Sequence, residues 1–226
     1  MKRFLAAAVI SVLCSTAVFA SDFSAEAYTD AVTKYLWRGQ VLSESFSLQP
    51  GFDISFGSLA FGFWGSHSLE SGEFEEADYT ISYSETVPGA DFLEISSGFT
   101  VYTFPYTPVS DGNNSTEVFI GIAGDVPASP YAAFYYDTVG GSGGYLDAGI
   151  SHDLDFEPVA VSLGAGLGYN FGQWGYEKSF TVLAPSASVS YGIENFSASA
   201  GLTGQIALDD QYEHDFFISL GISYGI

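Results

Sequence analysis

The chain has 226 residues and carries 27 acidic side chains against five Lys and Arg, so its formal net charge is −22. This excess of acids disfavours nucleic acid as a partner, because contacts to phosphates need basic side chains. Only 14% of the residues are charged while 17% are aromatic, which is atypical of a soluble acidic domain with a hydrated surface.

The first twenty residues have the layout of a secretory signal peptide. Lys2 and Arg3 form a basic start, an apolar run follows, and Val18 and Ala20 fit the rule of small residues before the cleavage site. We expect cleavage after Ala20, which leaves one domain at residues 21–226 and takes the net charge from −22 to −24. A retained anchor helix is the alternative, although the apolar run is short for a membrane span.

Apolar residues alternate with small or polar residues along the whole mature chain. In the stretch VAVSLGAGLGYN (residues 159–170), one set is Val, Leu, Ala and Tyr, and the other is nearly all Ser and Gly. A period of two indicates a β-strand, whose successive side chains point to opposite faces. We count twelve such runs, near residues 27–37, 47–57, 59–66, 77–86, 91–104, 116–125, 130–137, 144–154, 158–169, 181–192, 195–208 and 215–226.

The connections between these runs alternate between short and long, which is typical of the hairpin plan of an outer-membrane β-barrel. The longer set lies at residues 38–46, 67–76, 105–115, 138–143, 170–180 and 209–214. We therefore predict an all-β protein, a single antiparallel transmembrane barrel of about twelve strands. Its apolar face should meet lipid and its Gly and Ser face should line the lumen, because an open sheet edge in lipid would leave backbone groups unpaired.

Aromatic side chains near the strand ends are expected to form girdles at the two membrane interfaces. The set is Tyr35, Trp37, Phe104, Tyr169, Phe171 and Tyr191. The alternative fold is a soluble sandwich or jelly roll in the periplasm. Such a fold would need a charged outer face, whereas the second faces of these runs are largely Gly and Ser.

A few charged residues fall on the face of the strands that should line the lumen. Asp30, Lys34 and Arg38 share one parity on the first run, and Asp53 and Glu94 have the lumenal parity on later runs. If the first hairpin turns near residue 43 or 44, Lys34 lies across from Asp53. These residues either form ion pairs that neutralise charge in a narrow barrel or make a constriction that tunes ion passage.

The long connections are rich in acids, which should surround the outer mouth of the barrel. The set is Glu70, Glu73, Glu75, Glu76, Asp78, Asp209, Asp210, Glu213 and Asp215. Three interpretations stay open: plain solvation, attraction of cations to a pore, and bridging to anionic lipopolysaccharide through divalent cations, which carboxylates bind. Residues 209–215 lack the spacing of an EF-hand, so we expect no dedicated metal site.

The three histidines offer little for catalysis. His67 and His214 fall in the long connections, and His152 has the lipid-facing parity. His214 near Asp209 and Asp210 is the best candidate for acid–base chemistry, which needs a His and a carboxylate at one height. We assign no catalytic residue, no cofactor and no metal, and we expect that the protein is not an enzyme.

The stretch YLWRGQVLSESFSLQPGFDISFGSLAFGFWGS, from Tyr35 to Ser66, resembles the beginning of a family of outer-membrane porins, the TorF type. The matching residues are Tyr35, Trp37, Arg38, Gly39, Gln49, Pro50, Trp64 and Gly65. The resemblance implies an outer-membrane barrel with passive passage of solutes, and it supplies no catalytic residues. One departure is Ile226 at the end of the chain, where outer-membrane barrels usually have Phe.

From these patterns we predict a porin of the cell outer membrane that passes small hydrophilic solutes and prefers cations. The expected partners are outer-membrane lipid, lipopolysaccharide and small solutes, with a homo-oligomer as a further option. Two other classes remain: a structural or adhesion barrel closed by its own side chains, and a barrel enzyme. The small lumenal residues, Gly and Ser above all, favour the porin because they leave space in the barrel.

Overall fold

The computed structural model describes residues 23–105 and 114–226. The predicted signal peptide and its cleavage site lie outside the described residues, as do residues 106–113 of one long connection. In the described part of the chain, no helix has the length and apolar character needed to cross a membrane.

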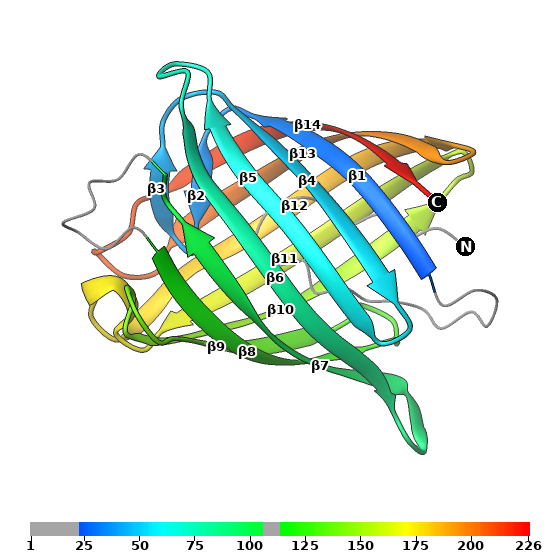
Figure 1. Ribbon diagram of the computed structural model, residues 1–226, viewed down its shortest axis with the longest axis horizontal. Coiled ribbons are helices and arrows are strands. Elements are labelled where there is room, and N and C mark those ends of the chain that lie inside the picture. Colours follow the sequence, from blue (N-terminus) through cyan, green and yellow to red (C-terminus); the bar gives the residue numbers. More distant parts are fainter. Residues whose placement is uncertain (1–22, 106–113) are drawn as a thin grey trace.

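The described residues form a closed antiparallel barrel of twelve strands, which confirms the predicted fold class. Each strand pairs with its neighbour in the chain, and β1 closes the barrel against β14 (Figure 1). The strands are β1 (Phe23–Val32), β4 (Ser47–Phe56), β5 (Leu59–Ser68), β6 (Phe74–Val87), β7 (Ala90–Thr103), β8 (Asn114–Gly124), β9 (Tyr131–Asp137), β10 (Gly143–Asp155), β11 (Val159–Asn170), β12 (Ser179–Ile193), β13 (Phe196–Ala207) and β14 (Asp215–Gly225).

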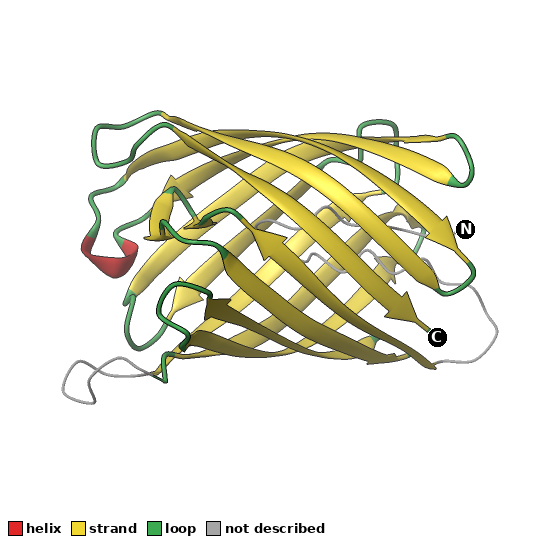
Figure 2. Ribbon diagram, turned by 90° about the horizontal axis from the view of Figure 1, so that it is seen from above, coloured by secondary structure: helices red, strands yellow, loops and turns green. Residues whose placement is uncertain are grey.

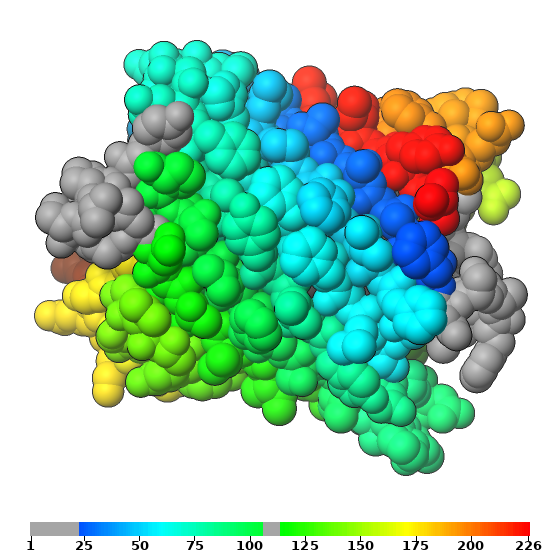
Figure 3. Space-filling model, viewed as in Figure 1, coloured from blue at the N-terminus to red at the C-terminus, as the bar shows by residue number. Residues whose placement is uncertain are grey.

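The two faces of the wall differ as the alternation predicts. Large apolar side chains such as Ile120 and Leu220 point outward and are 62% and 60% exposed, as expected for a surface that meets lipid. Figure 3 shows the face of β1 and β4 to β8 as a continuous surface of side chains. Between β10 and β14 the inward positions are mostly Gly and Ser.

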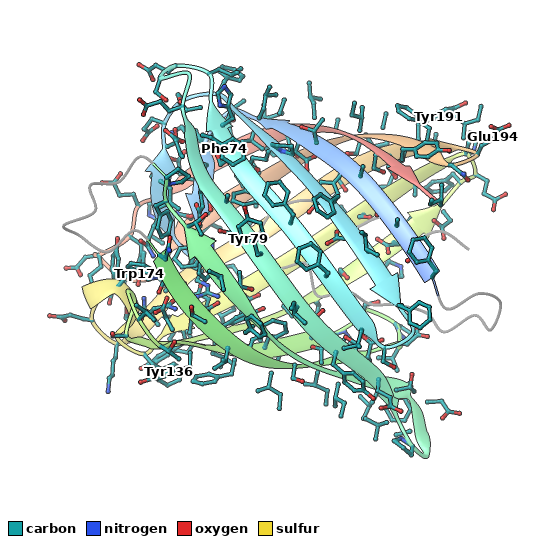
Figure 4. The ribbon with its side chains drawn as sticks, viewed as in Figure 1. Phe74, Tyr79, Tyr136, Trp174, Tyr191 and Glu194 are labelled. Carbon is teal, nitrogen blue, oxygen red and sulfur yellow. The ribbon has the colours of Figure 1, made fainter. Side chains whose placement is uncertain are left out.

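The two ends of the barrel also differ, and we name them by their connections. At the turn end, short turns join the strands and both ends of the described chain lie close by (Figures 1 and 2). At the loop end, longer connections include a short 3₁₀ turn, η2 (Gln173–Gly175). Trp174 of η2 lies at the loop end, while Tyr191 and Glu194 lie at the turn end (Figure 4).

The first connection departs from the prediction. The run expected at residues 27–37 ends as a barrel strand at Val32, and the chain then forms a separate hairpin of β2 (Tyr35–Trp37) and β3 (Gln40–Ser43). Both short strands lie at the loop end (Figure 1). Tyr35 and Leu36 are 8% and 7% exposed, so this connection is folded inward rather than spread into solvent.

The composition of the hairpin explains why it turns inward. Leu36 packs with Val32 and with Phe217 of β14 in a buried apolar cluster, and Val41 covers that cluster. Each large apolar side chain that leaves water stabilises the fold by about 1.5–3 kcal/mol. An exposed loop with these side chains would forgo that gain, so the inner wall of the barrel is the favourable place for them.

Candidate functional site

Arg38 lies at the tip of the hairpin and forms an ion pair across the lumen with Glu117 of β8. Its Nη1 donates to Glu117 Oε2 at 2.6 Å and its Nη2 donates to Oε1 at 2.8 Å. Arg38 and Glu117 are only 4% and 1% exposed. A two-pronged contact of this kind is the strongest geometry available to Arg and a carboxylate. Burial alone would lower the pKa of Arg38, but the Glu117 carboxylate raises it above its ordinary value.

Aromatic rings surround the same guanidinium group. Arg38 Cζ lies 4.5 Å from the ring centres of Trp37, Tyr135 and Tyr145 alike. At this distance the cation is attracted to each ring face, and in a site without water such a contact contributes about 2 kcal/mol. Tyr135 and Tyr145 belong to β9 and β10, so two of the three rings come from the barrel wall.

The η2 turn supplies an amide to the site. Gln173 Oε1 accepts from Arg38 Nη1 at 2.8 Å, while Gln173 Nε2 donates to Glu117 Oε2 at 2.6 Å. Asn170, the last residue of β11, fixes the turn because its Oδ1 accepts from the backbone N–H of Gln173 at 2.7 Å. Gln173 is fully buried, so this side chain of the turn reaches into the loop-end side of the lumen.

Two further contacts hold the hairpin to other parts of the wall. Tyr35 donates its hydroxyl to Glu76 of β6 at 2.9 Å, and its ring packs against Trp64 of β5. On the other side, Gln205 of β13 donates to the carbonyl oxygen of Gly39 at 2.9 Å. The hairpin therefore spans the lumen, with contacts to both sides of the barrel.

Gly39 is required at the tip for a steric reason. Its φ of +88° is a left-handed conformation that favours glycine, and an added Cβ would lie 2.7 Å from the ring of Tyr212. The preceding residue, Arg38, has a φ of +50°, which is uncommon for a residue with a side chain. The turn thus delivers the guanidinium to Glu117 at some cost in backbone strain.

Lys34 does not lie where the parity argument put it. Asp53 faces Glu26 of β1 in the register, and Lys34 instead pairs with Asp215 and Glu44 at 2.8 Å each. The prediction that Lys34 lies across from Asp53 is wrong because β1 ends before Lys34 and the chain turns into the hairpin. The hydrogen bonds to Asp215 and Glu44 raise the pKa of Lys34.

Beyond the hairpin toward the turn end, the charged lumenal side chains of the described residues are all acids. Val32 of β1 and Tyr145 of β10 contact the hairpin. The next lumenal side chains toward the turn end are Asp30 on β1 and Asp147 on β10. Other acids lie nearer the turn end, namely Glu26, Asp53, Glu94 and Asp153. We call this stretch the turn-side lumen, and the buried layer around Arg38 the hairpin layer.

The acids predicted for the outer mouth fall into two groups. Glu70, Glu73, Asp209, Asp210 and Glu213 lie in the loop-end connections, and Gln211 lowers the pKa of Asp209 by hydrogen bonding. The others belong to strands, namely Glu75, Glu76 and Asp78 in β6 and Asp215 in β14. Glu76 is 5% exposed and faces the hairpin, so its placement in a solvated loop is wrong.

Some expected girdle aromatics and histidines are also placed differently. Tyr35 and Trp37 belong to the hairpin inside the lumen, not to the membrane interface. Tyr169 and Phe171 pack together with Phe180, whose ring lies 5.0 Å from that of Tyr169, as a girdle requires. Among the histidines, His67 lies in β5 rather than in the connection after it. His214 lies in its predicted connection, where its Nδ1 accepts from the backbone N–H of Ala207.

Arg38 was singled out from the sequence, but its partners were not. Glu117, Gln173, Tyr135 and Tyr145 lie between 79 and 135 positions further along the chain. Their inward parity was visible, since Glu117, Tyr135 and Tyr145 fall on the lumenal face of their runs. What the sequence does not show is which distant residues the first connection meets, because only closure of the barrel brings them together.

Comparison with solved structures supports the fold. An outer-membrane channel from Pseudomonas putida F1 is 11% identical with a TM-score of 0.52, over 93% of this chain and 97% of its own. The NanC porin is 7% identical with a TM-score of 0.54, over 88% of this chain and 98% of its own. At such low identity, the likeness shows a shared barrel architecture.

Fold and site together define a closed twelve-stranded barrel that its own first connection narrows from inside. No protein-family model matches the chain, and no curated protein matches it either. The resemblance of residues 35–66 to TorF-type porins therefore stays a prediction.

Proposed function

We propose that the protein is an outer-membrane porin that passes small hydrophilic solutes and prefers cations. The observation that carries this proposal is the distribution of charge. The three basic residues of the described chain, Lys34, Arg38 and Lys178, all lie at the loop end, whereas the charged side chains described in the turn-side lumen are all acids. The apolar outer surface and the similar channel folds support a place in the outer membrane.

The physics of a charged channel supports the preference for cations. A cleft lined by one sign of charge raises the local concentration of counter-ions, by an amount that falls as salt screens the field. Rings of Asp and Glu select cations in other pores on the same principle. Lys34 and Arg38 are each paired with carboxylates, so they oppose this field only weakly.

The wall of the turn-side lumen leaves room for water. Ser162, Ser186 and Ser188 face inward and are half-buried rather than buried. In the hairpin layer, by contrast, Tyr145 and Gln173 are 2% and 0% exposed. Water therefore reaches the lumen from the turn end, and the hairpin layer is the constriction that sets passage.

A closed structural barrel is the second candidate, and one observation favours it. The hairpin layer buries an ion pair and several polar side chains almost completely, which is what a permanent plug would do. In that case the acids at the loop end, such as Glu70 and Glu73, would serve contacts outside the cell. Bridging to lipopolysaccharide through divalent cations and assembly into oligomers are further expectations.

Conductance separates the two candidates. The purified protein would be inserted into a planar bilayer, and the reversal potential would be measured in a KCl gradient at low and at molar salt. We expect discrete conductance steps and a cation preference that weakens in molar salt. Anion preference would contradict the charge argument, and the absence of any conductance would favour the structural barrel.

A further inference from the structure

The pocket around Arg38 belongs to the barrel wall, although the cation in it comes from the hairpin. We define the guanidinium site as Tyr102, Glu117, Tyr135, Tyr145 and Gln173. These residues come from β7, β8, β9, β10 and the η2 turn. The site is thus a feature of the rigid wall, and Arg38 enters it from a separate element.

The wall residues hold one another in place without help from Arg38. Tyr102 donates to Glu117 Oε1 at 2.9 Å, and Gln173 Nε2 donates to Glu117 Oε2 at 2.6 Å. The hydroxyl of Tyr145 is hydrogen bonded to Thr181 at 3.0 Å. A site whose side chains are fixed by their own contacts is ready for a ligand before the ligand arrives.

The chemistry of the site selects a planar cation. The two Glu117 oxygens accept from two different nitrogens of Arg38, and the Gln173 oxygen accepts a further N–H. The ring centres of Tyr135 and Tyr145 each lie 4.5 Å from the guanidinium carbon. A guanidinium group has the flat shape and the paired donors for such a site, while an ammonium group lacks both.

Arg38 fits this site imperfectly. Its buried Nε finds no hydrogen-bond partner among the described residues, and its backbone φ is +50°. Both features cost free energy when the hairpin is docked. A free solute has no hairpin turn to strain, so it can occupy the same site without the backbone cost.

Departure of the hairpin is coupled to the arrival of another cation. If Arg38 left alone, Glu117 would lose the cation that neutralises its carboxylate, which is unfavourable. A solute cation that takes its place removes that penalty. By the usual linkage, a ligand that binds only when the hairpin has left shifts the protein toward the open state.

From this arrangement, and resting on the proposed porin function, we propose a specificity for the channel. The guanidinium site recognises solutes that carry a guanidinium group, and Arg38 is the internal ligand that occupies it in the closed state. Such a solute opens the lumen by displacing Arg38. Asp147, two residues beyond Tyr145 on the lumenal face, then offers the next carboxylate, and Asp30 and Asp53 continue the acidic lining.

The first test is electrical and uses the wild-type protein in a planar bilayer. Methylguanidinium is the probe, because it copies the end of the Arg38 side chain. Methylurea is its neutral counterpart of the same shape, and methylammonium is a cation of different shape. We expect open probability to rise with millimolar methylguanidinium, to stay unchanged with methylurea, and to rise much less with methylammonium. An equal response to both cations, or none to methylguanidinium, would overturn the proposal.

The second test is calorimetric binding to folded protein in detergent micelles. R38A empties the site, so it should bind methylguanidinium about tenfold more tightly than wild type or better, because no internal ligand competes. R38A/E117Q should lose this binding. K34A removes a cation that precedes the hairpin and pairs outside the guanidinium site, so it should bind methylguanidinium as wild type does. Weak binding by folded R38A, or binding kept in R38A/E117Q, would refute the proposal.

The two tests also separate this inference from the porin function on which it rests. A shift of the R38A band on boiling in SDS shows that this variant is folded. If R38A does not fold, the recordings of the wild-type protein with methylguanidinium decide whether the guanidinium site exists. Conductance by R38A without methylguanidinium binding would leave the porin intact and remove the guanidinium site. Binding by R38A with no conductance in any variant would keep the site and remove the porin.

Discussion

The hairpin layer and the turn-side lumen share one barrel wall, but side chains fill the first almost completely and leave the second partly open. In the hairpin layer, Glu117 and Gln173 are almost completely buried, and every ring around Arg38 is in contact with it. In the turn-side lumen, inward Ser and Gly leave the same strands half-exposed. The barrel wall therefore sets the available width, and the first connection, together with Gln173 of the η2 turn, fills the loop-end part of it.

Removal of the hairpin should have the largest effect on the difference in free lumenal space between the two regions. If a Gly-Ser linker of equal length replaces residues 35–43, the barrel should still close, because β1 and β4 pair directly along their whole length. Circular dichroism should keep its strand signal, and single-channel conductance should rise several-fold. Loss of the strand signal would mean that the hairpin is needed for the barrel itself.

Breaking the ion pair should release the hairpin with the barrel intact. E117A leaves a buried guanidinium without its carboxylate, which costs ~3–5 kcal/mol. Arg38 should then leave the lumen, and trypsin should cut after it in intact folded protein. E44A is the matched control, since the Glu44 carboxylate is 68% exposed and its pair with Lys34 contributes ~0–1 kcal/mol. Protection of Arg38 in E117A would show that other contacts hold the hairpin.

Gly166 and Gly168, on the same face of β11, test the difference in packing between the two regions. A Cβ at Gly168 would collide with the hydroxyls of Tyr145 and Thr181, whereas one at Gly166 would lie 3.4 Å from the Tyr131 hydroxyl. G168A should therefore destabilise the protein by ~1–3 kcal/mol, as overpacking does, and G166A should be close to neutral. Denaturant unfolding measures both, and similar losses would mean that the two regions are equally packed.

The smallest effect is expected from the charges of the turn-side lumen. D30N/D53N removes two lumenal carboxylates and should lower the cation preference at low ionic strength, with little change in molar salt. E70Q/E73Q removes two exposed loop carboxylates and should do less, because they face bulk water. Reversal potentials measure both variants. An equal or larger effect of the loop variant would move selectivity to the outer mouth.

The strand plan could be predicted from the sequence because its signal is local. Except at β1, the alternating runs marked the wall strands to within a few residues, and the parity of Glu117 and Tyr145 placed them inside. The hairpin could not be found in this way, because the first predicted run includes Tyr35 to Trp37 and the first predicted connection begins only at residue 38. Its partners are fixed only by closure of the barrel, which brings β8, β10 and η2 to the hairpin tip.

One signal for the hairpin was nevertheless present. The connection from residue 33 to 46 contains Tyr35, Leu36, Trp37, Val41 and Leu42, too many apolar side chains for a loop in water. An apolar loop between two barrel strands has to be buried somewhere, and the lumen is the nearest place. The prediction that Lys34 faces Asp53 failed because it extended β1 through this segment.

The sequence separation of the hairpin's contacts has a consequence for assembly. Arg38 meets residues 79 and 135 positions away, and Gly39 meets Gln205, 166 positions away. Val32 of β1 meets Ser219 of β14 at a still larger separation. Closing such long loops costs conformational entropy, and it is the closed barrel that brings β8, η2 and β13 to the hairpin. Protection of Arg38 from trypsin would therefore report more than the hairpin itself, because it requires that wall segments far along the chain are already in place.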